Sequence, residues 1–567
     1  MTDAPGLQGN QDLPPEQDLV DDAIASSETG RASAILAAGT IVSRVLGFAR
    51  GVVLALAIGQ VSSASANAFG VANQLPNNLY ALVAGGVLSA VLVPQIVKAG
   101  LHSDGGEKFI NRVVTLGIVV FAVVTVAATL AAPALIALYT RQDGGGQVGF
   151  SAHTIQLATV FAYWCLPQIF FYALYSLLSE VLNARRIFGP FTWAPVLNNV
   201  VSIAGIVVFM LLFGGASQNS SVAVWDSGRI VLLGATTTLS VAAQALVLFL
   251  FWKRAGLRFR PDFRWRGVGL GATGRAAGWL FGMVLVTQVA GVFQTQVSTL
   301  SPTAGVAALQ NSWLIFMLPH SVVAVSIATA YFTRMSGHAS RGDLDAVRND
   351  LSSSLRSIGL LIVFGAVALA VVAFPFARVY ESEFSHAAAM AAVILAFLPG
   401  LILFSMLFVI QRVFYALGDT RTPFFMQCIQ AALFIVGALL CTTLPHDWIG
   451  VGVAAVTSIA GSAQALVAIM LVRRRLGGMD GRLLVVRHLQ YLGLALVSGA
   501  VGAGVVLLLG GFRADGFAQS SLLAALLTIV AAGTLMAAAY FGLLTLFRNP
   551  ELAAVTGTLT ARFRRAG

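Results

Sequence analysis

Charged residues are scarce in this chain of 567 residues, where Asp, Glu, Lys and Arg together make up only 10%. Soluble proteins carry about 25% charged residues, so the deficit argues against a soluble enzyme or binding domain. Hydrophobic residues make up 57% and gather in segments of 20–30 residues. Such segments are too long for barrel strands but suit membrane-crossing helices. The sequence therefore predicts an all-α, multi-pass membrane protein.

Cysteine and common enzyme motifs are scarce as well. The three cysteines, Cys165, Cys428 and Cys441, lie inside apolar segments, which favours core packing over a disulfide or a metal site. No Gly-Lys dipeptide occurs, which excludes a Walker-type phosphate-binding loop. Every predicted cytoplasmic loop is shorter than about 25 residues. We therefore expect no enzyme activity, ATP binding, cofactor or metal, and any transport is expected to be secondary or driven by the membrane potential.

The apolar segments predict fourteen spans with both chain ends in the cytoplasm. The net charge of +11 comes from basic residues spread over short loops, which favours membrane topology over nucleic-acid binding. Of 34 Lys and Arg residues, 28 fall in the tails and even-numbered loops and four in the odd-numbered loops, so the positive-inside rule sets the orientation. The predicted spans are 32–59, 65–97, 113–138, 153–182, 190–213, 230–252, 273–299, 304–333, 357–377, 387–416, 422–445, 450–472, 488–511 and 518–547.

A weak internal duplication divides these spans. Residues 181–191 and 413–424, about 232 residues apart, each place charged residues in a tight turn before Pro-Phe. Proline at a helix start is common in any membrane protein, which is the simpler explanation. With the span count, the duplication predicts six-helix bundles over 32–252 and 273–472 and two extra helices over 488–547, an architecture typical of transporters. Polar, acidic residues 1–31 are predicted to be a disordered cytoplasmic tail, and 548–567 a basic cytoplasmic tail.

Two arginines, Arg44 and Arg50, lie in the middle of the first span. A charge at that depth costs roughly 2.5–3.5 kcal/mol, so each side chain needs an anionic partner. Of the 23 Asp and Glu residues only Glu180 falls within a span, near its predicted cytoplasmic end. The pair therefore predicts a binding site for an external anion. The alternatives are that Arg44 reaches back to the cytoplasmic face, and that Gly47 and Gly51 serve close helix packing.

Uncharged amides cluster in the second, seventh and eighth spans. Amides inside a membrane must face partners, a cavity or water. They predict a hydrated cavity between the two bundles, whereas the simpler alternative is hydrogen bonding between helices. His320 is also expected to be satisfied inside the protein rather than to carry protons. With the two arginines, the candidate substrate-binding residues are Arg44, Arg50, Asn67, Asn73, Asn77, Asn78, Gln294, Asn311 and His320.

Several motifs carry a resemblance to one family. Residues 43–50 (Ser-Arg-Val-Leu-Gly-Phe-Ala-Arg), 67–69 (Asn-Ala-Phe) and 75–77 (Leu-Pro-Asn) resemble the start of the MurJ (MviN) family. Residues 183–190 (Asn-Ala-Arg-Arg-Ile-Phe-Gly-Pro), 194–198 (Ala-Pro-Val-Leu-Asn) and 412–423 (Arg-Val-Phe-Tyr-Ala-Leu-Gly-Asp-Thr-Arg-Thr-Pro) extend the likeness. It covers nearly the whole chain from about residue 32.

The resemblance implies a transporter fold similar to the multidrug/oligosaccharidyl-lipid/polysaccharide exporters. It implies a flippase of the cell membrane that moves lipid II, the undecaprenyl-pyrophosphate peptidoglycan precursor, from the inner to the outer leaflet by alternating access. Arg44 and Arg50 match two arginines of the family's central cavity, at the pyrophosphate, and the last two helices would form a lipid-tail groove. Lipid II, membrane lipids and cell-wall synthesis proteins are the partners that it implies.

The chain also departs from the family pattern. The family often has an acid where this chain has Asn67, and further charges near Tyr80, Gly85 and Trp313, none of which is present. The cavity is therefore expected to be poor in charge, and sodium coupling is not expected. These departures leave open a flippase for another polyprenyl-linked glycan. A drug or cation antiporter is disfavoured because it needs intramembrane acids, and a non-transporting scaffold in cell-wall assembly is the remaining alternative.

Overall fold

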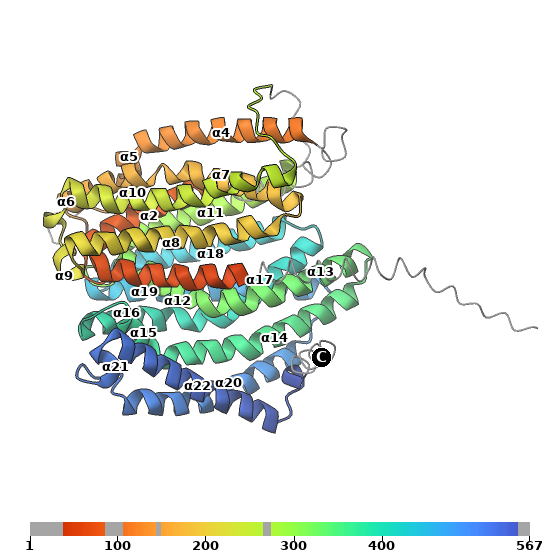
Figure 1. Cartoon of the computed structure of the whole chain (residues 1–567). Helices are drawn as coiled ribbons and strands as arrows, with labels where there is room; N and C mark the ends of the chain where they lie inside the picture. The colour runs from red at the N-terminus through yellow and green to blue at the C-terminus, as the bar shows by residue number, and fades with distance from the viewer. Residues whose placement is uncertain (1–37, 85–105, 143–148, 265–273, 554–567) are drawn as a thin grey trace, which may run out of the picture.

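The described part of the chain consists almost entirely of helices that run side by side (Figure 1). The structure is a computed structural model that describes residues 38–84, 106–142, 149–264 and 274–553. Within these ranges, thirteen helices are long and apolar enough to cross a membrane. The predicted all-α membrane class is confirmed.

These thirteen helices coincide with every predicted span except the second. The second span is present as α2 (Ala64–Ala84), whose hydropathy is lowered by its five Asn and Gln residues. The rest of that predicted span, 85–97, lies outside the described residues, as do both predicted tails, 1–31 and most of 548–567. Thirteen of the fourteen predicted spans therefore correspond to helices that are long and apolar enough to cross a membrane. That the second predicted span also crosses the membrane stays a prediction.

The helices form an N-lobe, a C-lobe and a final pair. The N-lobe comprises the first helix (Ala38–Ile58), α2, α4 (Glu107–Leu130), α5 (Ala132–Tyr139), α6 (Ala152–Cys165), α7 (Gln168–Ala184), α8 (Phe188–Phe213), the short α9 (Ala216–Asn219) and α10 (Ser227–Leu246). The C-lobe comprises α11 (Gly274–Ser298), α12 (Val306–Pro319), α13 (Val325–Ser340), α14 (Leu344–Val371), α15 (Ala373–Arg378), α16 (Phe384–Phe397), α17 (Leu401–Ala416), α18 (Arg421–Cys441) and α19 (Ile449–Arg475). The final pair is α20 (Gly481–Leu508) and α22 (Leu522–Leu546), joined through the short α21 (Phe517–Ser520).

Three of the long spans are interrupted at proline. Pro167 separates α6 from α7, Pro319 precedes a π turn between α12 and α13, and Pro399 lies in the 3₁₀ turn between α16 and α17. Proline lacks the N–H that an α-helix needs and clashes with the preceding turn. These kinks accommodate spans of 33–35 residues, which exceed the ~20 residues that cross a bilayer.

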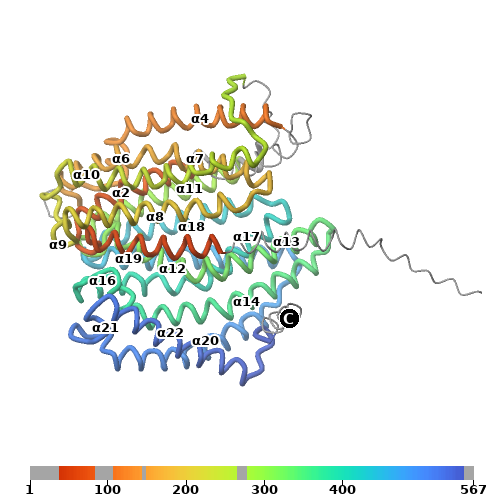
Figure 2. The backbone as a smooth tube through the Cα atoms, viewed as in Figure 1, coloured from red at the N-terminus to blue at the C-terminus, as the bar shows by residue number. Residues whose placement is uncertain are grey.

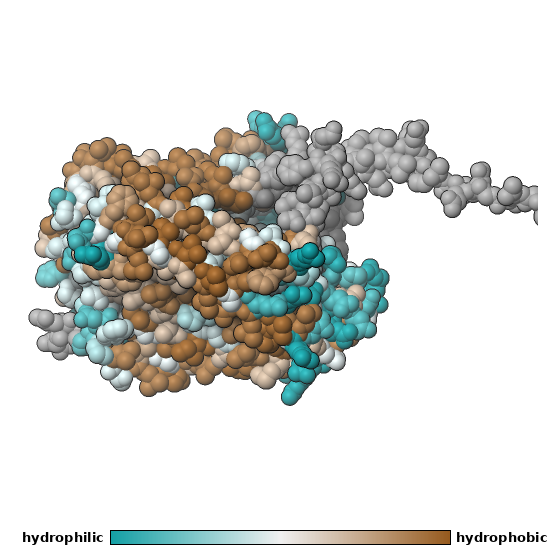
Figure 3. Space-filling view, turned by 90° about the horizontal axis from the view of Figure 1, so that it is seen from below, coloured by the Kyte–Doolittle hydropathy of each residue, from teal (hydrophilic) through white to brown (hydrophobic). Residues whose placement is uncertain are grey.

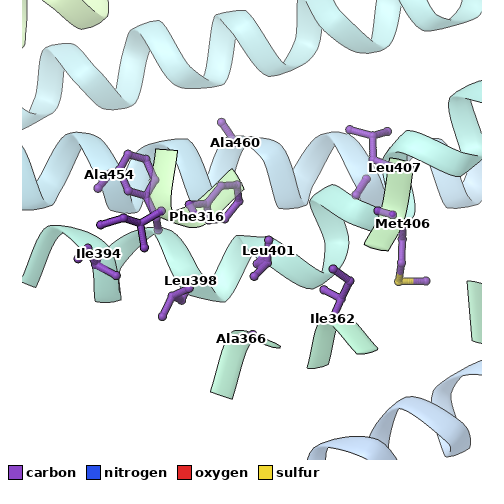
Figure 4. Close-up of a cluster of buried hydrophobic side chains, with 14 of the residues drawn as sticks. Phe316, Ile362, Ala366, Ile394, Leu398, Leu401, Met406, Leu407, Ala454 and Ala460 are labelled. Atoms are coloured by element: carbon purple, nitrogen blue, oxygen red, sulfur yellow. The ribbon is translucent and has the colours of Figure 1, made fainter. Parts of the chain in front are cut away.

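Each lobe has its own apolar core. The C-lobe core gathers side chains from α12, α14, α16, α17 and α19, with Phe316 among them (Figure 4). Each core also contains side chains from the other lobe. Val52 and Ala55 of the first helix pack in the C-lobe core, and Val306 of α12 packs in an N-lobe core. The predicted bundle boundaries themselves stay a prediction.

The first helix lies between the lobes (Figure 2). On its N-lobe side, the Asn199 side chain of α8 donates a hydrogen bond to the Ser43 carbonyl at 2.9 Å. On its C-lobe side, the Phe48 ring meets Phe376 and Tyr380 edge-on, with ring centres 5.4 and 5.6 Å away. The residues that flank Arg44 and Arg50 are therefore fixed by contacts with both lobes.

The final helix pair packs on α14 of the C-lobe. Tyr540 of α22 donates a hydrogen bond to the Leu360 carbonyl at 2.8 Å and stacks on Phe364. The molecular face on this side is broadly hydrophobic, with hydrophilic residues towards its ends (Figure 3). Large apolar side chains that these two helices expose are Leu489, Leu496, Val497, Leu507, Leu508, Leu523, Leu527, Val530 and Leu535.

The two ends of the bundle differ in charge. We call the end with the turns at 185–187, 252–264, 341–343, 417–420 and 476–480 the basic end, since most of the described arginines and lysines lie there. The opposite end, called the far end, carries the turns at 59–63, 214–226, 299–305, 379–383 and 509–521. These two names are used below to locate the cavity and its seal.

Candidate functional site

Glycines bring other helices close to the first helix beside its two arginines. A Cβ added at Gly51 would lie 3.2 Å from the Asn311 side-chain oxygen of α12 and 3.5 Å from the Tyr380 hydroxyl. A Cβ at Gly47 would meet Asn199 of α8 at 3.7 Å. Gly51 thus allows close helix packing, which is the alternative that the sequence left open for these two glycines. At Gly47 an added Cβ would be in ordinary van der Waals contact, so no glycine is required there.

Arg44 and Arg50 are both half-buried. Among the described residues, neither guanidinium has an ion pair or a hydrogen bond. The Arg44 charge acts on His320 of the C-lobe, whereas the Arg50 charge acts on Tyr172 of α7 in the N-lobe. The six-residue spacing also rotates the two side chains by about 120° relative to each other around the helix.

His320 begins the π turn in the middle of the eighth span and is 2% exposed. Its Nδ1 lies 3.0 Å from the Ser405 hydroxyl of α17. Its ring lies against Phe404 and Phe408, with centres 4.7 and 5.4 Å apart. His320 is thus a satisfied interior histidine, as its sequence position favoured, and it forms the C-lobe wall that faces Arg44.

Arg412 is a further cation at this wall. Its guanidinium lies over the Phe408 ring at 4.7 Å and over Phe332 at 5.5 Å. It has no carboxylate partner among the described residues. The charge count assigned Arg412 to a cytoplasmic loop, which was wrong, because it lies within α17. Residue 412 lies inside the predicted span 387–416, so the predicted spans themselves already placed this arginine in a helix rather than in a loop.

A cavity of about 500 Å³ opens between the C-lobe helices and α2. An adjoining cavity of about 210 Å³ shares Asn78, Gly291, Gln294, Trp313 and Thr457 with it and extends between the lobes towards Gln74 and Gln310. No charged residue lines either one within the described chain. The larger cavity is lined by Asn78, Thr287, Gln288, Ala290, Gly291, Gln294, Trp313, Phe316, Phe397, Gly400, Phe404, Gln427, Gln430, Phe434, Thr457, Ser458, Gly461 and Gln464.

The lobes are joined by hydrogen bonds at the far end. The Val61 N–H donates to Glu381 at 2.7 Å, and the Ser62 N–H donates to the Thr303 carbonyl at 3.0 Å. The Gln60 and Asn311 side chains also bond to each other. We call these contacts, together with the α2–α12 bonds described next, the far-end seal.

Amides of α2 continue the far-end seal towards the cavity. The Asn67 side-chain oxygen accepts from the Ala307 N–H at 3.1 Å. Gln310 donates to Gln74 at 2.6 Å, and Gln74 donates to Thr295 at 2.6 Å. Every partner crosses from the N-lobe to the C-lobe, so the seal must break if the lobes separate at this end.

Glu381 is the charged group of the seal and is 6% exposed. The pKa of Glu381 is raised to about 7, mainly by burial and also by the nearby Glu383, although the Val61 N–H and Arg378 act in the opposite direction. His386 of α16 lies 3.7 Å from both Glu381 and Glu383. A carboxyl with this pKa changes charge near neutral pH.

Comparison with known proteins assigns this chain to a family. The family model described as lipid II flippase MurJ matches residues 55–528, from the end of the first helix to the first turns of α22. This chain belongs to the lipid II flippase MurJ family. The two expectations that rested on the motifs, the family and its transporter fold, are confirmed.

Relatives of the MurJ family agree with this assignment. A protein of Haemophilus influenzae named probable lipid II flippase MurJ is 27% identical over 455 residues, covering 75% of this chain and 83% of the relative. A protein of Rhizobium tropici with the same name is 25% identical over 484 residues, covering 83% and 85%. These relatives are aligned over most of their own length.

Solved structures show the same fold. The chain is similar to a lipid II flippase MurJ in an inward closed conformation, with a TM-score of 0.69 at 19% identity over 90% of this chain and 99% of that one. It is also similar to an inward-facing MATE family transporter of the MOP superfamily, with a TM-score of 0.59 at 18% identity over 77% and 94%. The MATE structure matches less of this chain than the MurJ structure does.

The structure separates the predicted site residues into groups. Asn78 and Gln294 line the cavity. Asn67 and Asn311 are engaged in the far-end seal. Asn73 is half-buried and Asn77 is exposed, and the cavity lining includes neither. Arg44 and Arg50 are half-buried on the first helix, and His320 is buried in the C-lobe within reach of the Arg44 charge.

Sequence reasoning missed the glutamines of α18 and α19. Gln427, Gln430 and Gln464 line the cavity with Gln288 and Gln294 of α11. The sequence could have indicated them, since these three glutamines lie in the largely apolar predicted spans 422–445 and 450–472. Their meeting depends on the packing of α11, α18 and α19, which spacing along the chain does not give.

Proposed function

We propose that this protein is a flippase that moves lipid II from the cytoplasmic to the outer leaflet of the cell membrane for peptidoglycan synthesis. The observation that carries the proposal is the match of the lipid II flippase MurJ family model across 55–528. The unpaired arginines between the lobes support it, because a polyprenyl-pyrophosphate brings the anion that the protein itself lacks at that depth.

The charge distribution supports the orientation needed for export. The basic end carries most of the described arginines and lysines, so the positive-inside rule puts it in the cytoplasm. The far end, with only Arg141, Arg229, Arg378 and Arg513, then faces outward. The far-end seal closes the outer side, which leaves the cavity to receive substrate from the cytoplasm.

Three arginines are suited to receive the pyrophosphate. Arg44 and Arg412 approach the His320 wall from the two lobes, and Arg50 lies deeper along the first helix. A guanidinium binds phosphate oxygens through paired N–H groups, which makes it a better anchor than an ammonium.

Transport then requires the contacts between the two lobes to change. Separation of the far-end seal and closure at the basic end would expose the head group outward, by alternating access. Moving negative charge out of a negative interior is favoured by about 2.3 kcal/mol per charge for each 100 mV. The membrane potential therefore supplies a driving force without ATP.

The final helix pair is suited to hold the lipid tail. α20 and α22 present a broad apolar surface (Figure 3), which belongs in contact with acyl or polyprenyl chains. The tail would stay in the bilayer beside this pair while the head group crosses between the lobes. The protein is accordingly a multi-pass protein of the cell membrane.

A flippase for another polyprenyl-linked glycan is the second candidate. The observation in its favour is the uncharged lining of the cavity, which lacks groups to recognise the charged peptide of lipid II. A drug or cation antiporter gains no support, because no carboxylate lines this cavity within the described chain.

Complementation tests the proposal directly. Cells depleted of their own lipid II flippase would receive this gene, and lipid II at the outer leaflet would be measured by an externally added reagent that modifies it. Restored accessibility and growth are expected. Failure by a protein that is inserted at normal levels would favour the second candidate.

A further inference from the structure

We propose that the glutamine-lined cavity of the C-lobe is a binding subsite for the uncharged sugar rings of the head group. This inference rests on the proposed function and names the part of the substrate that this cavity takes. The subsite is lined mainly by α11, α12, α18 and α19, with single residues from α2, α16 and α17, and no arginine is among its described lining residues.

A ladder of amides supplies its hydrogen-bonding groups. Gln464 of α19 donates to Gln427 of α18 at 3.1 Å, and Gln427 donates to Gln430 at 2.9 Å. A primary amide has two N–H donors and an oxygen with two lone pairs, so each end of the ladder keeps unused capacity. Donors at Gln430 and acceptor positions at Gln464 are both available to hydroxyl groups.

Two more glutamines face the ladder across the cavity. Gln288 and Gln294 of α11 are half-buried, and their amides have no protein partner among the described residues. Amides inside a membrane protein that are not bonded to protein must bond to water or ligand. A hydroxyl-rich ligand satisfies such groups because each hydroxyl both donates and accepts.

Aromatic rings form another part of the lining. Trp313 stacks on Phe316 at 4.8 Å and meets Phe397 and Phe404 edge-on at 5.6 and 5.8 Å. A pyranose ring has hydroxyls around its edge and C–H groups on its faces. A lining that combines amides with aromatic rings therefore suits its two kinds of surface.

The lining excludes other parts of the head group. No charged side chain stands among the lining residues, so neither a pyrophosphate nor a charged peptide would find a counter-ion there. The volume of about 500 Å³ falls within the ~300–1,000 Å³ of small-molecule sites. A neutral, hydroxyl-rich group of one or two rings is the occupant that fits.

The position of the cavity matches the covalent order of the substrate. Phe404 lines the cavity on one face and lies 4.7 Å from the His320 ring on the other. Arg44 of the first helix is in turn close enough to His320 for its charge to act on the imidazole. A pyrophosphate held at the arginines thus places the sugar attached to it beside Phe404 and the glutamine ladder.

Binding measurements with two probes test the subsite. The purified full-length protein would be titrated with undecaprenyl-pyrophosphate and with the same lipid carrying the disaccharide. In the variant Gln430→Leu/Gln464→Leu we expect about a tenfold loss of affinity for the disaccharide lipid, because two neutral hydrogen bonds are removed. Affinity for the sugar-free lipid should stay unchanged.

Matched variants keep the test sharp. Gln244→Leu removes a buried amide of α10 that accepts from Asn198 at 2.6 Å, far from the cavity, and should leave both affinities unchanged. Arg44→Ala should weaken both lipids alike. Thermal unfolding midpoints near that of the wild type would establish that each variant is folded.

Several results would overturn the inference. If Gln430→Leu/Gln464→Leu lowered the affinity for both lipids equally, the glutamines would not be recognising the sugar. An unchanged affinity for the disaccharide lipid, with loss of sodium binding instead, would assign the amides to a cation. If the wild-type protein bound neither lipid, the proposed function itself would fail, which is a different outcome.

Discussion

Glu381 accepts a hydrogen bond from the Val61 N–H at 2.7 Å, and this bond joins a buried carboxyl of the C-lobe to the first turn after the first helix of the N-lobe. The two residues are 320 positions apart in the chain. The bond exists only while the lobes meet at the far end. A titratable group thus stands at the contact that transport must break.

The first prediction concerns the pH dependence of this contact. Burial raises the pKa of Glu381 to about 7 in the sealed state, whereas an exposed glutamate titrates near ~4.3. The protonated carboxyl is thus favoured in the sealed state. Sealing is strongest below about pH 4, weakens as the pH rises towards 7 and is weakest above it, where burial of the charge opposes closure.

Labelling from outside the cell would measure that dependence. The Val61 side chain is 3% exposed, and Val61→Cys keeps the backbone N–H, so a membrane-impermeant maleimide reports opening. Because maleimide reacts with the thiolate, labelling is divided by that of an exposed cysteine at the same pH. This ratio should increase between pH 5 and pH 8 and become independent of pH in Glu381→Gln. Arg378, Glu383 and His386 also surround the carboxyl, so the same trend persisting in Glu381→Gln would assign the effect to them.

The second prediction concerns the two arginines of the first helix. Arg44→Ala and Arg50→Ala should each reduce lipid II accessibility at the outer leaflet at least about tenfold, because a charge-assisted hydrogen bond is worth about 1.5–3 kcal/mol. Arg513→Ala is the control, since this exposed arginine pairs only with Asp515 at the far end. Normal export by both first-helix variants, at normal protein levels, would contradict their assignment.

The third prediction distinguishes the contribution of the Arg412 positive charge from that of its planar guanidinium. Its guanidinium lies over the Phe408 and Phe332 rings, a contact that a lysine reproduces poorly. Arg412→Lys should therefore lower export severalfold, and Arg412→Ala should lower it more. If Arg412→Lys and Arg412→Ala both export like the wild type, Arg412 has only a packing role. Export would be measured against insertion, with Arg421→Lys at the basic end as control.

Hydropathy predicted which segments cross the membrane, because the cost of exposing polar backbone in lipid makes long apolar runs unambiguous. It did not give the rotation of each helix or its neighbours. Six residues separate Arg44 from Arg50, and the nearby groups on which their charges act, His320 and Tyr172, belong to different lobes. The rotation could be calculated from the spacing, but the identity of each facing helix could not.

The role of the amides shows the same limit. Asn67 and Asn311 were recognised as polar residues that need partners, and they found them in the other lobe. Asn78 and Gln294 belong to the same predicted class and line the cavity instead. An amide satisfied by protein and one left for a ligand look alike in sequence, because the difference is set by tertiary contacts and by the conformational state.

The last prediction uses the two glycines of the first helix as a matched pair. In Gly51→Ala the new Cβ would lie 3.2 Å from the Asn311 oxygen, so the Asn311 side chain must shift, whereas the Tyr380 hydroxyl at 3.5 Å is in ordinary contact. Asn311 also bonds to Gln60, and the shift therefore strains the far-end seal. In Gly47→Ala the nearest atom is 3.7 Å away, which is ordinary contact. Both changes add the same methyl group to one helix and raise its helix propensity alike.

Maleimide labelling at Val61→Cys would read out the difference. Gly51→Ala should increase labelling severalfold because the seal opens more often, whereas Gly47→Ala should match the parent. Export by Gly51→Ala should fall, since a flippase that favours the outward state seldom accepts substrate from the cytoplasm. Equal labelling of the two variants would mean that Asn311 can shift without disturbing Gln60, and the far-end seal would then not depend on close packing at Gly51.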